Sequence, residues 1–455
     1  MTIVPTDAQM SAIVDLASTT RPITRLHGYA GTGKTSVVAT QAIRALERQG
    51  VSVQVLAPTG KAAKVLRSKG LHGASTIHSY LYAPSKRERR AWREMWDDFA
   101  ADALARDESL ALMISDIDTA TGEANVEPSW DALIKKAGAK TAKAAQQIRD
   151  EKRFELAFTA SGAIAYYEEY GVPAADVLLI DEASMVSAAV SADLERTGSR
   201  LIFVGDPAQL PPVKAQRSTA AMGEPHHLLT QVHRQKGGSP VLKLATQIRK
   251  TEGAPRLERT GRRSLRSIEE YAQVLCWRNA TREQVNAQVR RALGRRSPVS
   301  PEAGDRLVCL KNTKKRDDGG KQWMNGEQAT ILEVGRELDD SIVLTVRDDE
   351  DVEHEVFSPV ETFRGHRAEQ AYIDRSGWAT HDPVFAFGYA LTVHKSQGSE
   401  WPTVLLVDES ADMISMTERR EGRAAALLQA RQWLYTGCTR ASEEVHIVRS
   451  LRDVL

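Results

Sequence analysis

The stretch that decides the fold is "HGYAGTGKTS", His27 to Ser36. Within it, Gly28 to Thr35 fit the spacing G-x-x-x-x-G-K-[ST], in which glycines let the backbone turn tightly and aim N–H groups at phosphate oxygens. The run "PITRL" before it predicts a strand, and "TSVVATQAI" predicts a helix that begins just after Lys34. We therefore expect a triphosphate site rather than an ordinary Gly-rich turn, a feature that kinases, GTPases, transporters and motors share.

Two carboxylates at a strand tip add to this nucleotide site. In "DVLLIDEAS", the apolar residues Val177 to Ile180 are followed by Asp181 and Glu182. A carboxylate at the end of a buried strand beside a phosphate loop suits a Mg²⁺ ligand better than a plain surface turn. We expect Thr35 and Asp181 to hold Mg²⁺, and Glu182 to orient or deprotonate the attacking water. Lys34 is expected to contact the β- and γ-phosphates. The other expected nucleotide contacts in the loop are Gly28, Ala30, Gly31, Thr32, Gly33 and Ser36.

Length and composition indicate an ordinary globular protein of about three domains, with 455 residues and a formal net charge of +1. Its three cysteines are far apart and form no CxxC pair, which argues against a disulfide framework or a zinc site and fits a reducing compartment. The N-terminus lacks the features of a signal peptide, and no apolar run approaches the length of a membrane span. We expect a cytoplasmic protein.

Short apolar runs that predict buried parallel strands recur, with helical patterns between many of them. They are "RPITRLHG", "VSVQVLA", "DVLLIDE" and "RLIFVGD", and later "YAQVLCW", "PTVLLVD" and "EEVHIVRS". Strand–helix alternation predicts a parallel sheet with helices on its faces. Because it occurs in two blocks, we expect an α/β protein with two parallel-sheet lobes.

Two stretches interrupt the alternation. The first has a helical pattern, with Trp92, Trp96 and Phe99 at i, i+4 and i+7, a stripe more typical of a small core than of a functional surface. The second carries "DRLVCLKN", "EQATILEV" and "SIVLTVRD", short β-like runs that predict a small β-barrel. The expected division is a first lobe at 1–84 and 169–236 with a mainly helical insert at 85–168, and a second lobe at 237–299 and 381–455 with a β-barrel insert at 300–380.

Local charge is uneven although the total is near zero. The chain is rich in Arg and Lys from Lys243 to Arg316, and it is acidic from Glu337 to Glu355. A basic run is usually a solvated face, but it also suits nucleic acid, and both interpretations remain open for this one.

Three further segments separate the classes of nucleotide-driven protein. They are "GDPAQLPPV" after a predicted strand, "ALTVHKSQGSEWPTVLLV" from Ala390 to Val407, and "WLYTGCTRASEEVHIV" from Trp433 to Val448. In this order, and with the phosphate loop, they resemble the motif set of superfamily-1 helicases. They are most similar to the RecD-like branch, which includes the Dda-type helicases of phages. The resemblance covers about residues 1–82, 174–250 and 384–450.

The resemblance implies a role for each matching residue. Gln9 would read adenine, Gln209 would sense the γ-phosphate, and Arg440 would be an arginine finger from the second lobe. Arg234 in "QVHRQ" would also reach the γ-phosphate. Gly398 and Glu400 would face the nucleotide. The residues implied to contact single-stranded DNA are Pro58, Thr59, Lys61, Thr76, His78, Thr392, His394 and Lys395.

For the whole protein, the resemblance implies two RecA-like lobes that use ATP and Mg²⁺ to translocate 5′ to 3′ on single-stranded DNA and unwind duplex at single-strand–duplex junctions. The helical insert would be a candidate wedge. A monomer in a bacterial or phage-infected cell, with replication or recombination proteins as partners and no membrane, is the corresponding expectation. Three alternatives stay open: a helicase subunit of a recombination nuclease, an RNA helicase of the same superfamily, and a nucleotide-dependent scaffold without hydrolysis.

Overall fold

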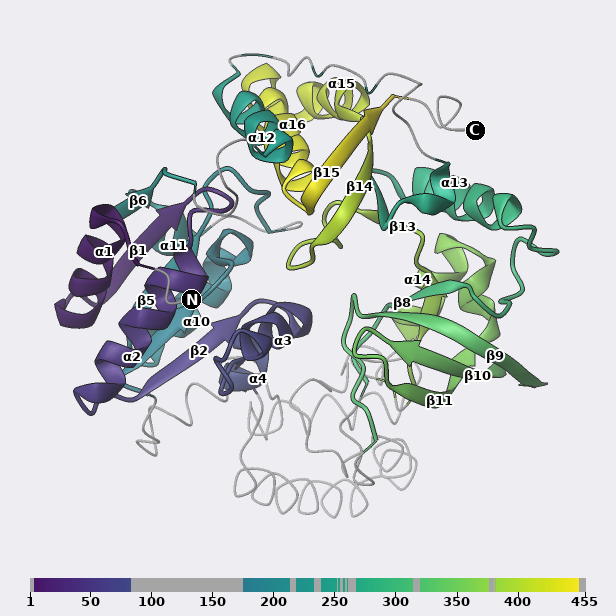
Figure 1. The fold of residues 1–455 in the computed structure, drawn as a ribbon, viewed down its shortest axis with the longest axis horizontal. Helices are drawn as coiled ribbons and strands as arrows, with labels where there is room; N and C mark the ends of the chain where they lie inside the picture. Colours follow the sequence, from purple (N-terminus) through teal and green to yellow (C-terminus); the bar gives the residue numbers. More distant parts are fainter. Residues whose placement is uncertain are drawn as a thin grey trace, which may run out of the picture.

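The computed structural model describes residues 4–82, 175–212, 218–232, 239–251, 253, 257, 260, 267–313, 320–375, 380 and 382–449. These residues form two parallel sheets with helices packed on them and one antiparallel sheet (Figure 1). The expected helical insert at 85–168 lies outside the described residues, so the prediction of a wedge there stays a prediction.

The first sheet has six parallel strands in the order β3-β2-β4-β5-β1-β6. Their bounds are β1 Ile23–Gly28, β2 Val53–Ala57, β3 Ser75–Thr76, β4 Val177–Ile180, β5 Arg200–Gly205 and β6 His227–Leu229. The helices around this sheet are α1 Asp7–Ser18, α2 Thr40–Arg48, α3 Gly60–Ser68, α4 Ile77–Tyr82, α10 Ala188–Arg196 and α11 Thr219–Met222. A π-helical turn over Lys34–Ala39 precedes α2, and a 3-10 turn over Ala183–Met185 follows β4.

Strand β4 shows why an unbroken apolar run becomes a central strand here. All four of its residues are buried. Val177 and Leu179 pack into a core with α1, α2 and α3, whereas Leu178 and Ile180 pack into a core with α4, α10 and α11. A strand covered on both faces has no solvent side, so its sequence does not alternate with polar residues.

The second parallel sheet has the order β13-β7-β14-β15. Its strands are β7 Gln273–Cys276, β13 Ala390–Thr392, β14 Trp401–Val407 and β15 Ala441–Val448. The helices in this part of the chain are α12 Pro240–Lys250, α13 Asn279–Ala292, α15 Ser410–Glu421 and α16 Arg423–Cys438, and a 3-10 turn covers Ile268–Glu270. With the first sheet, these strands account for all seven of the apolar runs that predicted parallel strands.

The region expected to be a β-barrel forms a five-stranded antiparallel sheet in the order β11-β10-β9-β8-β12. Its bounds are β8 Arg306–Cys309, β9 Gln328–Leu338, β10 Ser341–Asp348, β11 Glu353–Pro359 and β12 Phe385–Phe387, with a 3-10 turn at Val360–Arg364 and α14 at His366–Arg375. No pairing that closes the sheet into a barrel is found among the described residues. The sheet also passes the expected boundary at 380, because β12 pairs with β8.

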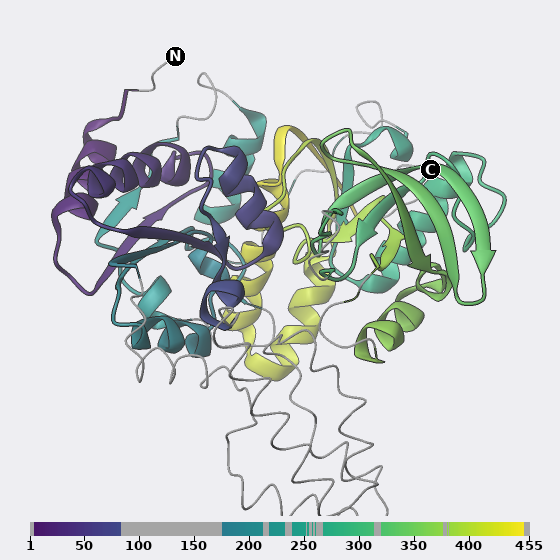
Figure 2. The ribbon, with the colours of Figure 1, turned by 90° about the horizontal axis from the view of Figure 1, so that it is seen from below.

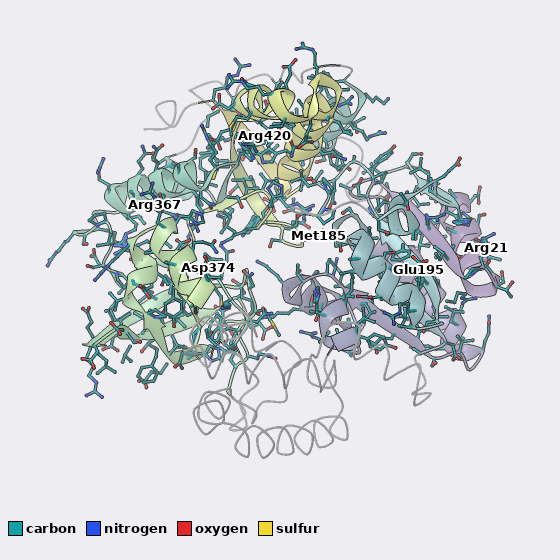
Figure 3. The ribbon with its side chains drawn as sticks, turned by 180° about the vertical axis from the view of Figure 1, so that it is seen from behind. Arg21, Met185, Glu195, Arg367, Asp374 and Arg420 are labelled. Carbon is teal, nitrogen blue, oxygen red and sulfur yellow. The ribbon has the colours of Figure 1, made fainter. Side chains whose placement is uncertain are left out.

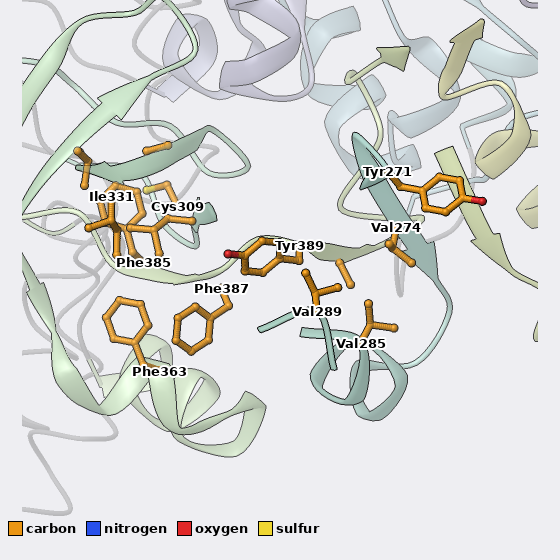
Figure 4. Close-up of a cluster of buried hydrophobic side chains, with 14 of the residues drawn as sticks. Tyr271, Val274, Val285, Val289, Cys309, Ile331, Phe363, Phe385, Phe387 and Tyr389 are labelled. Carbon is orange, nitrogen blue, oxygen red and sulfur yellow. The ribbon is translucent and has the colours of Figure 1, made fainter. Parts of the chain in front are cut away.

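The antiparallel sheet and the second parallel sheet share a hydrophobic core. Figure 4 shows Phe363, Phe385 and Phe387 on one side of this cluster, with Val274 and Val289 on the other. Because the two sheets bury side chains in one continuous cluster, their packing is interdependent.

Helix α16 lies between the two halves of the molecule (Figure 2). Its residues from Gln432 to Cys438 are all buried. Charged side chains such as Arg21 and Arg420 lie on the outer surface instead (Figure 3). In the part of the chain that the structure describes, no helix combines the length and apolar character needed to cross a membrane.

Candidate nucleotide and nucleic-acid site

The loop between β1 and the following helix has the backbone of a phosphate cradle. Gly31 and Gly33 have φ angles of 77° and 76°, in the left-handed region that glycine adopts without strain. Lys34 is the first residue of the helical turn, and its Nζ donates to the carbonyl oxygens of Gly28 at 2.6 Å and Tyr29 at 3.0 Å. The lysine ammonium therefore lies against the loop that it would help to close around phosphate.

The expected metal ligands are in contact with each other. Thr35 Oγ1 donates to Asp181 Oδ1 at 3.0 Å and to Oδ2 at 3.1 Å. Burial, and then repulsion from Glu182, raise the pKa of Asp181 to about 6, although the Thr35 hydrogen bond and the Lys34 charge oppose the shift. A buried carboxylate with few compensating charges favours a bound cation, and a hydroxyl beside a carboxylate offers the oxygen ligands that Mg²⁺ prefers. These residues fit Mg²⁺.

The described residues contain no group of three or more His, Cys, Asp or Glu side chains that would hold a metal ion. This agrees with Mg²⁺, which takes one or two protein ligands and completes its shell with water and phosphate oxygens. Glu182, next to Asp181, has a φ of 52°, a left-handed conformation that costs a non-glycine residue about 1–3 kcal/mol. This strain turns the chain away from the sheet directly after β4.

The tip of β5 carries the expected phosphate sensor. Gln209 is 5% exposed and lies in the turn from Asp206 to Leu210. The carboxylate of Asp206 accepts from the hydroxyl of Tyr435 at 2.7 Å and from the backbone N–H of Ala208 at 3.0 Å. Burial raises the pKa of Asp206, while the Lys34 charge and the Tyr435 hydrogen bond act against that shift.

Arg440 approaches the same site from the second sheet. Its Nε donates to the carbonyl of Thr436 at 3.2 Å, its Nη1 to the carbonyl of Ser399 at 3.2 Å, and its Nη2 to Thr439 Oγ1 at 3.4 Å. The side chain is 6% exposed. These bonds hold a permanently charged guanidinium at the end of α16.

One cavity of about 930 Å³ joins these residues. Both halves of the molecule line it: Lys34, Asp181 and Glu182 come from the first, and Arg440 comes from the second. The other expected nucleotide residues along its wall are Gln9, Ala30, Gly31, Gly33, Thr35, Ser36, Gln209, Gly398 and Glu400. Gly28 and Thr32 belong to the loop but are not among the residues that line this cavity.

Gln9 has a different local role from the adenine contact that the resemblance implied. Its Oε1 accepts from the backbone N–H of Thr6 at 3.0 Å, and its Nε2 donates to the carbonyl of Thr32 at 2.9 Å. Thr6 and Gln9 form the capping box that begins α1. Both polar atoms of the amide are thus engaged in stabilising the helix start and the phosphate loop, although the side chain borders the cavity.

The first group of expected DNA contacts lies at the carboxyl end of the first sheet. Pro58 and Thr59 connect β2 to α3, where Thr59 Oγ1 caps the helix by accepting from Ala62 N at 3.2 Å. Thr76 pairs beside Ala57 at the neighbouring strand end. Its Oγ1 accepts from Ser79 N at 3.0 Å, which brings the start of α4 and His78 to the same edge.

Lys61, in the first turn of α3, contacts the antiparallel sheet instead of being free for a phosphate. Its Nζ donates to the carbonyl of Gly326 at 3.1 Å and lies 5.5 Å from the centre of the Trp401 ring. Lys64, one turn further on, pairs with Glu327 at 2.9 Å and Glu350 at 3.1 Å. Glu350 belongs to the acidic stretch that the sequence singled out, so part of that stretch covers the basic face of α3.

The second group of expected DNA contacts follows β13. Thr392 ends this strand, and its Oγ1 accepts from the backbone N–H of Lys395 at 3.4 Å. His394 and Lys395 are partly exposed. Burial and the charge of Arg282 lower the pKa of Lys395 to about 8, although Glu369 partly offsets them. The turn after these residues meets α3, because a Cβ on Gly398 would lie 3.4 Å from the Cβ of Ala62.

One expected residue lies outside the described residues, and several residues were missed. Arg234 falls in the first class. Tyr435, Asp206 and Arg249 were not selected, although the first two stand inside quoted motifs. The guanidinium of Arg249 lies 3.5 Å from the centre of the Tyr29 ring. A tyrosine inside a helix that also supplies an expected arginine finger was a usable signal, whereas Arg249 had none.

Comparisons with known proteins agree with this geometry. Residues 9–215 match a family model described as an AAA domain, and residues 387–448 match the UvrD-like helicase C-terminal domain. The chain is 28% identical over 279 residues to the ATP-dependent RecD2 DNA helicase of Deinococcus radiodurans, an alignment that covers 59% of this chain and 35% of the relative. The chain therefore spans about a third of the length of that relative.

Solved structures show the same fold across the whole chain. A structure of two coordinating Pif1 helicases unwinding forked double-stranded DNA has a TM-score of 0.50 at 16% identity, with 100% of this chain and 94% of that chain covered. Bacteroides Pif1 bound to single-stranded DNA gives a TM-score of 0.50 at 16% identity, with 100% and 95% covered. At this identity the likeness concerns the fold alone.

Proposed function

We propose that this chain, which belongs to the RecD-like helicases of superfamily 1, hydrolyses ATP to move 5′ to 3′ along single-stranded DNA and to unwind duplex ahead of it. The observation that carries the proposal is the shared cavity: Lys34 and Asp181 line it from the first sheet, and Arg440 lines it from the second. A site divided in this way allows hydrolysis to change the spacing of two lobes.

The residues support phosphoryl transfer to water. In the proposed reaction, Glu182 orients a water molecule and takes its proton as the water oxygen bonds to the γ-phosphorus. The bond from the γ-phosphorus to the bridging oxygen breaks, which yields ADP and phosphate. Lys34 and Arg440 stabilise the charge on the transferred group, and an arginine in this position is worth about 10³ to 10⁵ in rate. Gln209 and Arg234 are proposed to contact the γ-phosphate, and Gln9, Gly398 and Glu400 to complete the nucleotide site.

Thr35 and Asp181 would hold Mg²⁺, supported by their mutual contact and by the raised pKa of Asp181. When bound, Mg²⁺ would neutralise charge on the β- and γ-phosphates.

Single-stranded DNA is proposed to cross both lobes. Pro58, Thr59, Lys61, Thr76 and His78 would contact it from the first lobe. The second lobe would contribute Thr392, His394 and Lys395. The approach of Gly398 to α3 supports a continuous path between the two groups. Contacts to the DNA backbone give little sequence preference and a strong dependence on salt.

We extend the proposal to the whole chain on the basis of its family. Residues 1–84 and 169–236 would form the first lobe, and 237–299 and 381–455 the second. The wedge that splits duplex would belong to residues 85–168, and residues 300–380 would form the greater part of a β insert in the second lobe. A monomer in the bacterial cytoplasm, acting with replication or recombination proteins, is the setting that we propose.

A strand-displacement assay tests the function and its polarity together. We expect ATP-dependent release of the labelled strand from a duplex with a 5′ single-stranded tail, and no release from the same duplex with a 3′ tail. The Lys34→Ala variant is the control for contaminating helicase. Release only from the 3′-tailed substrate would contradict the polarity, and ATP hydrolysis that oligo(dT) does not stimulate would contradict the motor. Competition by RNA oligonucleotides would separate the DNA activity from an RNA activity.

A further inference from the structure

We propose that Tyr435 is a positioning residue that ties the phosphate loop to the helix carrying the arginine finger; this inference rests on the proposed function. The hydroxyl of Tyr435 accepts from the backbone N–H of Ala30 at 2.9 Å and donates to Asp206 Oδ2 at 2.7 Å. Tyr435 is 2% exposed. A single phenolic oxygen on α16 therefore joins the phosphate loop to the turn after β5.

The same helical turn also holds the sensor and the finger. Thr436 Oγ1 accepts from the backbone N–H of Leu210 at 3.0 Å, directly after Gln209. The carbonyl of Thr436 accepts from Arg440 Nε at 3.2 Å. Tyr435 and Thr436 thus bind the first lobe on one side and Arg440 on the other. Any displacement of the phosphate loop relative to α16 changes where the guanidinium lies.

A hydroxyl is chemically required for this junction. The Ala30 N–H needs an acceptor and the Asp206 carboxylate needs a donor, and a phenol supplies both through one atom. Phenylalanine keeps the ring and its packing but supplies neither. Asp206 is itself held by the N–H of Ala208, so the tyrosine completes a network whose other members are already in place.

A second contact from the same half of the molecule supports the junction. Arg249 of α12 lies over the ring of Tyr29, next to Ala30, at 3.5 Å from the guanidinium carbon to the ring centre. Helices α12 and α16 pack against each other through the core that contains Val241, Ala245 and Trp433. The loop is therefore gripped by two helices that move as one unit.

The inference predicts a specific kinetic effect. If Tyr435 positions Arg440 and does not bind nucleotide itself, its hydroxyl contributes to the transition state more than to the ground state. We expect Tyr435→Phe to lower the kcat of DNA-stimulated ATP hydrolysis about 10- to 100-fold, the scale of a misplacement near 1 Å, with a small change in KM. Affinity for ADP with aluminium fluoride should fall by the same factor, and affinity for ADP alone should not change.

Tyr389→Phe is a matched control. The Tyr389 hydroxyl also donates to a buried carboxylate, Asp305 Oδ1 at 2.9 Å, but inside the second half of the molecule and away from the cavity. We expect this variant to melt at a lower temperature with kcat and aluminium-fluoride affinity unchanged. If Tyr435→Phe yields no folded protein, Thr436→Val takes its place. It removes the acceptor for Leu210 N, and the same split between kcat and ADP affinity is expected.

The outcomes separate the two levels of the proposal. A wild-type protein without DNA-stimulated hydrolysis would overturn the proposed function and this inference with it. An active wild type whose Tyr435→Phe variant, or its Thr436→Val substitute, keeps full kcat would overturn the inference alone. So would an equal loss of affinity for ADP and for ADP with aluminium fluoride, or a Tyr389→Phe variant impaired to the same degree.

Discussion

Raising the pH from 7 to 9 should weaken the grip on single-stranded DNA through one lysine. Lys395 is the proposed DNA contact whose pKa is about 8, because burial and Arg282 disfavour its charged form more than Glu369 favours it. Its neighbour His394 has a pKa lowered by burial, so that ring is neutral throughout this range. The charge on Lys395 is present below its pKa and lost above it.

The size of the effect follows from the charged fraction. With a pKa of about 8, about 90% of free protein carries the Lys395 charge at pH 7 and about 10% at pH 9. If only the charged form grips a phosphate, the dissociation constant rises up to about tenfold, which is about 1.4 kcal/mol. One ionic contact fewer also lowers the slope of log affinity against log salt concentration by about 0.7 for a single strand.

Fluorescence anisotropy with labelled oligo(dT) measures both quantities. Titrations at several salt concentrations, at pH 7 and pH 9, give the affinity and the slope for wild type and for Lys395→Met. The variant should bind at pH 7 as the wild type does at pH 9, and its slope should not change with pH. The N-terminal amine titrates in the same range but is present in both proteins, so it cancels in the comparison.

Lys64→Met is the matched control because the neighbouring Glu327 and Glu350 raise the pKa of Lys64. That lysine stays charged at pH 9, so the variant should keep the full pH dependence of the wild type. The reasoning fails if wild type has one salt slope at both pH values, or if Lys395→Met loses affinity between pH 7 and 9 as steeply as wild type does.

Three further predictions concern the nucleotide site and the fold. Lys34→Ala should abolish phosphate release while circular dichroism stays native, and activity above a tenth of wild type would argue against its phosphate contact. Arg440→Lys should lower single-turnover hydrolysis about 10³-fold or more with ADP affinity kept, since one ammonium cannot replace a guanidinium; a loss below tenfold would contradict the finger. Asp305→Ala should lower the free energy of unfolding by about 3–5 kcal/mol in urea titrations, because Arg290, 2.7 Å away and 1% exposed, keeps a buried charge without its main partner. A change under 1 kcal/mol would show that this pair is not needed.

Much of the parallel-sheet architecture was predictable because local composition determines it. A run such as Val177–Ile180 is apolar on both faces, so it suits a strand covered by helices on both sides. The two-residue strand Ser75–Thr76 was not predictable, because it is polar and exists only through its pairing with Leu56 and Ala57. Its sequence carries no periodicity by which a strand is recognised.

The run from Val384 to Val393 shows a second limit. It is one apolar stretch, yet Phe385–Phe387 pairs antiparallel with β8 and Ala390–Thr392 pairs parallel with β7. Gly388 separates the two pairings, and a Cβ there would lie 2.7 Å from the carbonyl of Leu307. The need for glycine comes from a strand almost 80 positions earlier, so nothing local marked the change of sheet.

The candidate site divides in the same way. The phosphate loop and the acids after β4 were predictable because adjacent residues make them, and the shared cavity joins them to Arg440. The contacts of Lys61 with the loop at Gly326 and of Lys64 with Glu327 and Glu350 were not, because long-range packing creates them.

Helix α16 links packing to the proposed mechanism. Its residues from Gln432 to Cys438 are buried on every side, and Trp433, Leu434 and Cys438 belong to a core that also contains Leu210 from the turn after β5. A close-packed interior transmits a displacement instead of absorbing it. Because Arg440 follows this helix directly, movement of the phosphate loop or of the sensor turn reaches the guanidinium with little loss. A helix with a solvent face would bend under the same load, so complete burial of α16 is the property that allows binding at one end to control chemistry at the other.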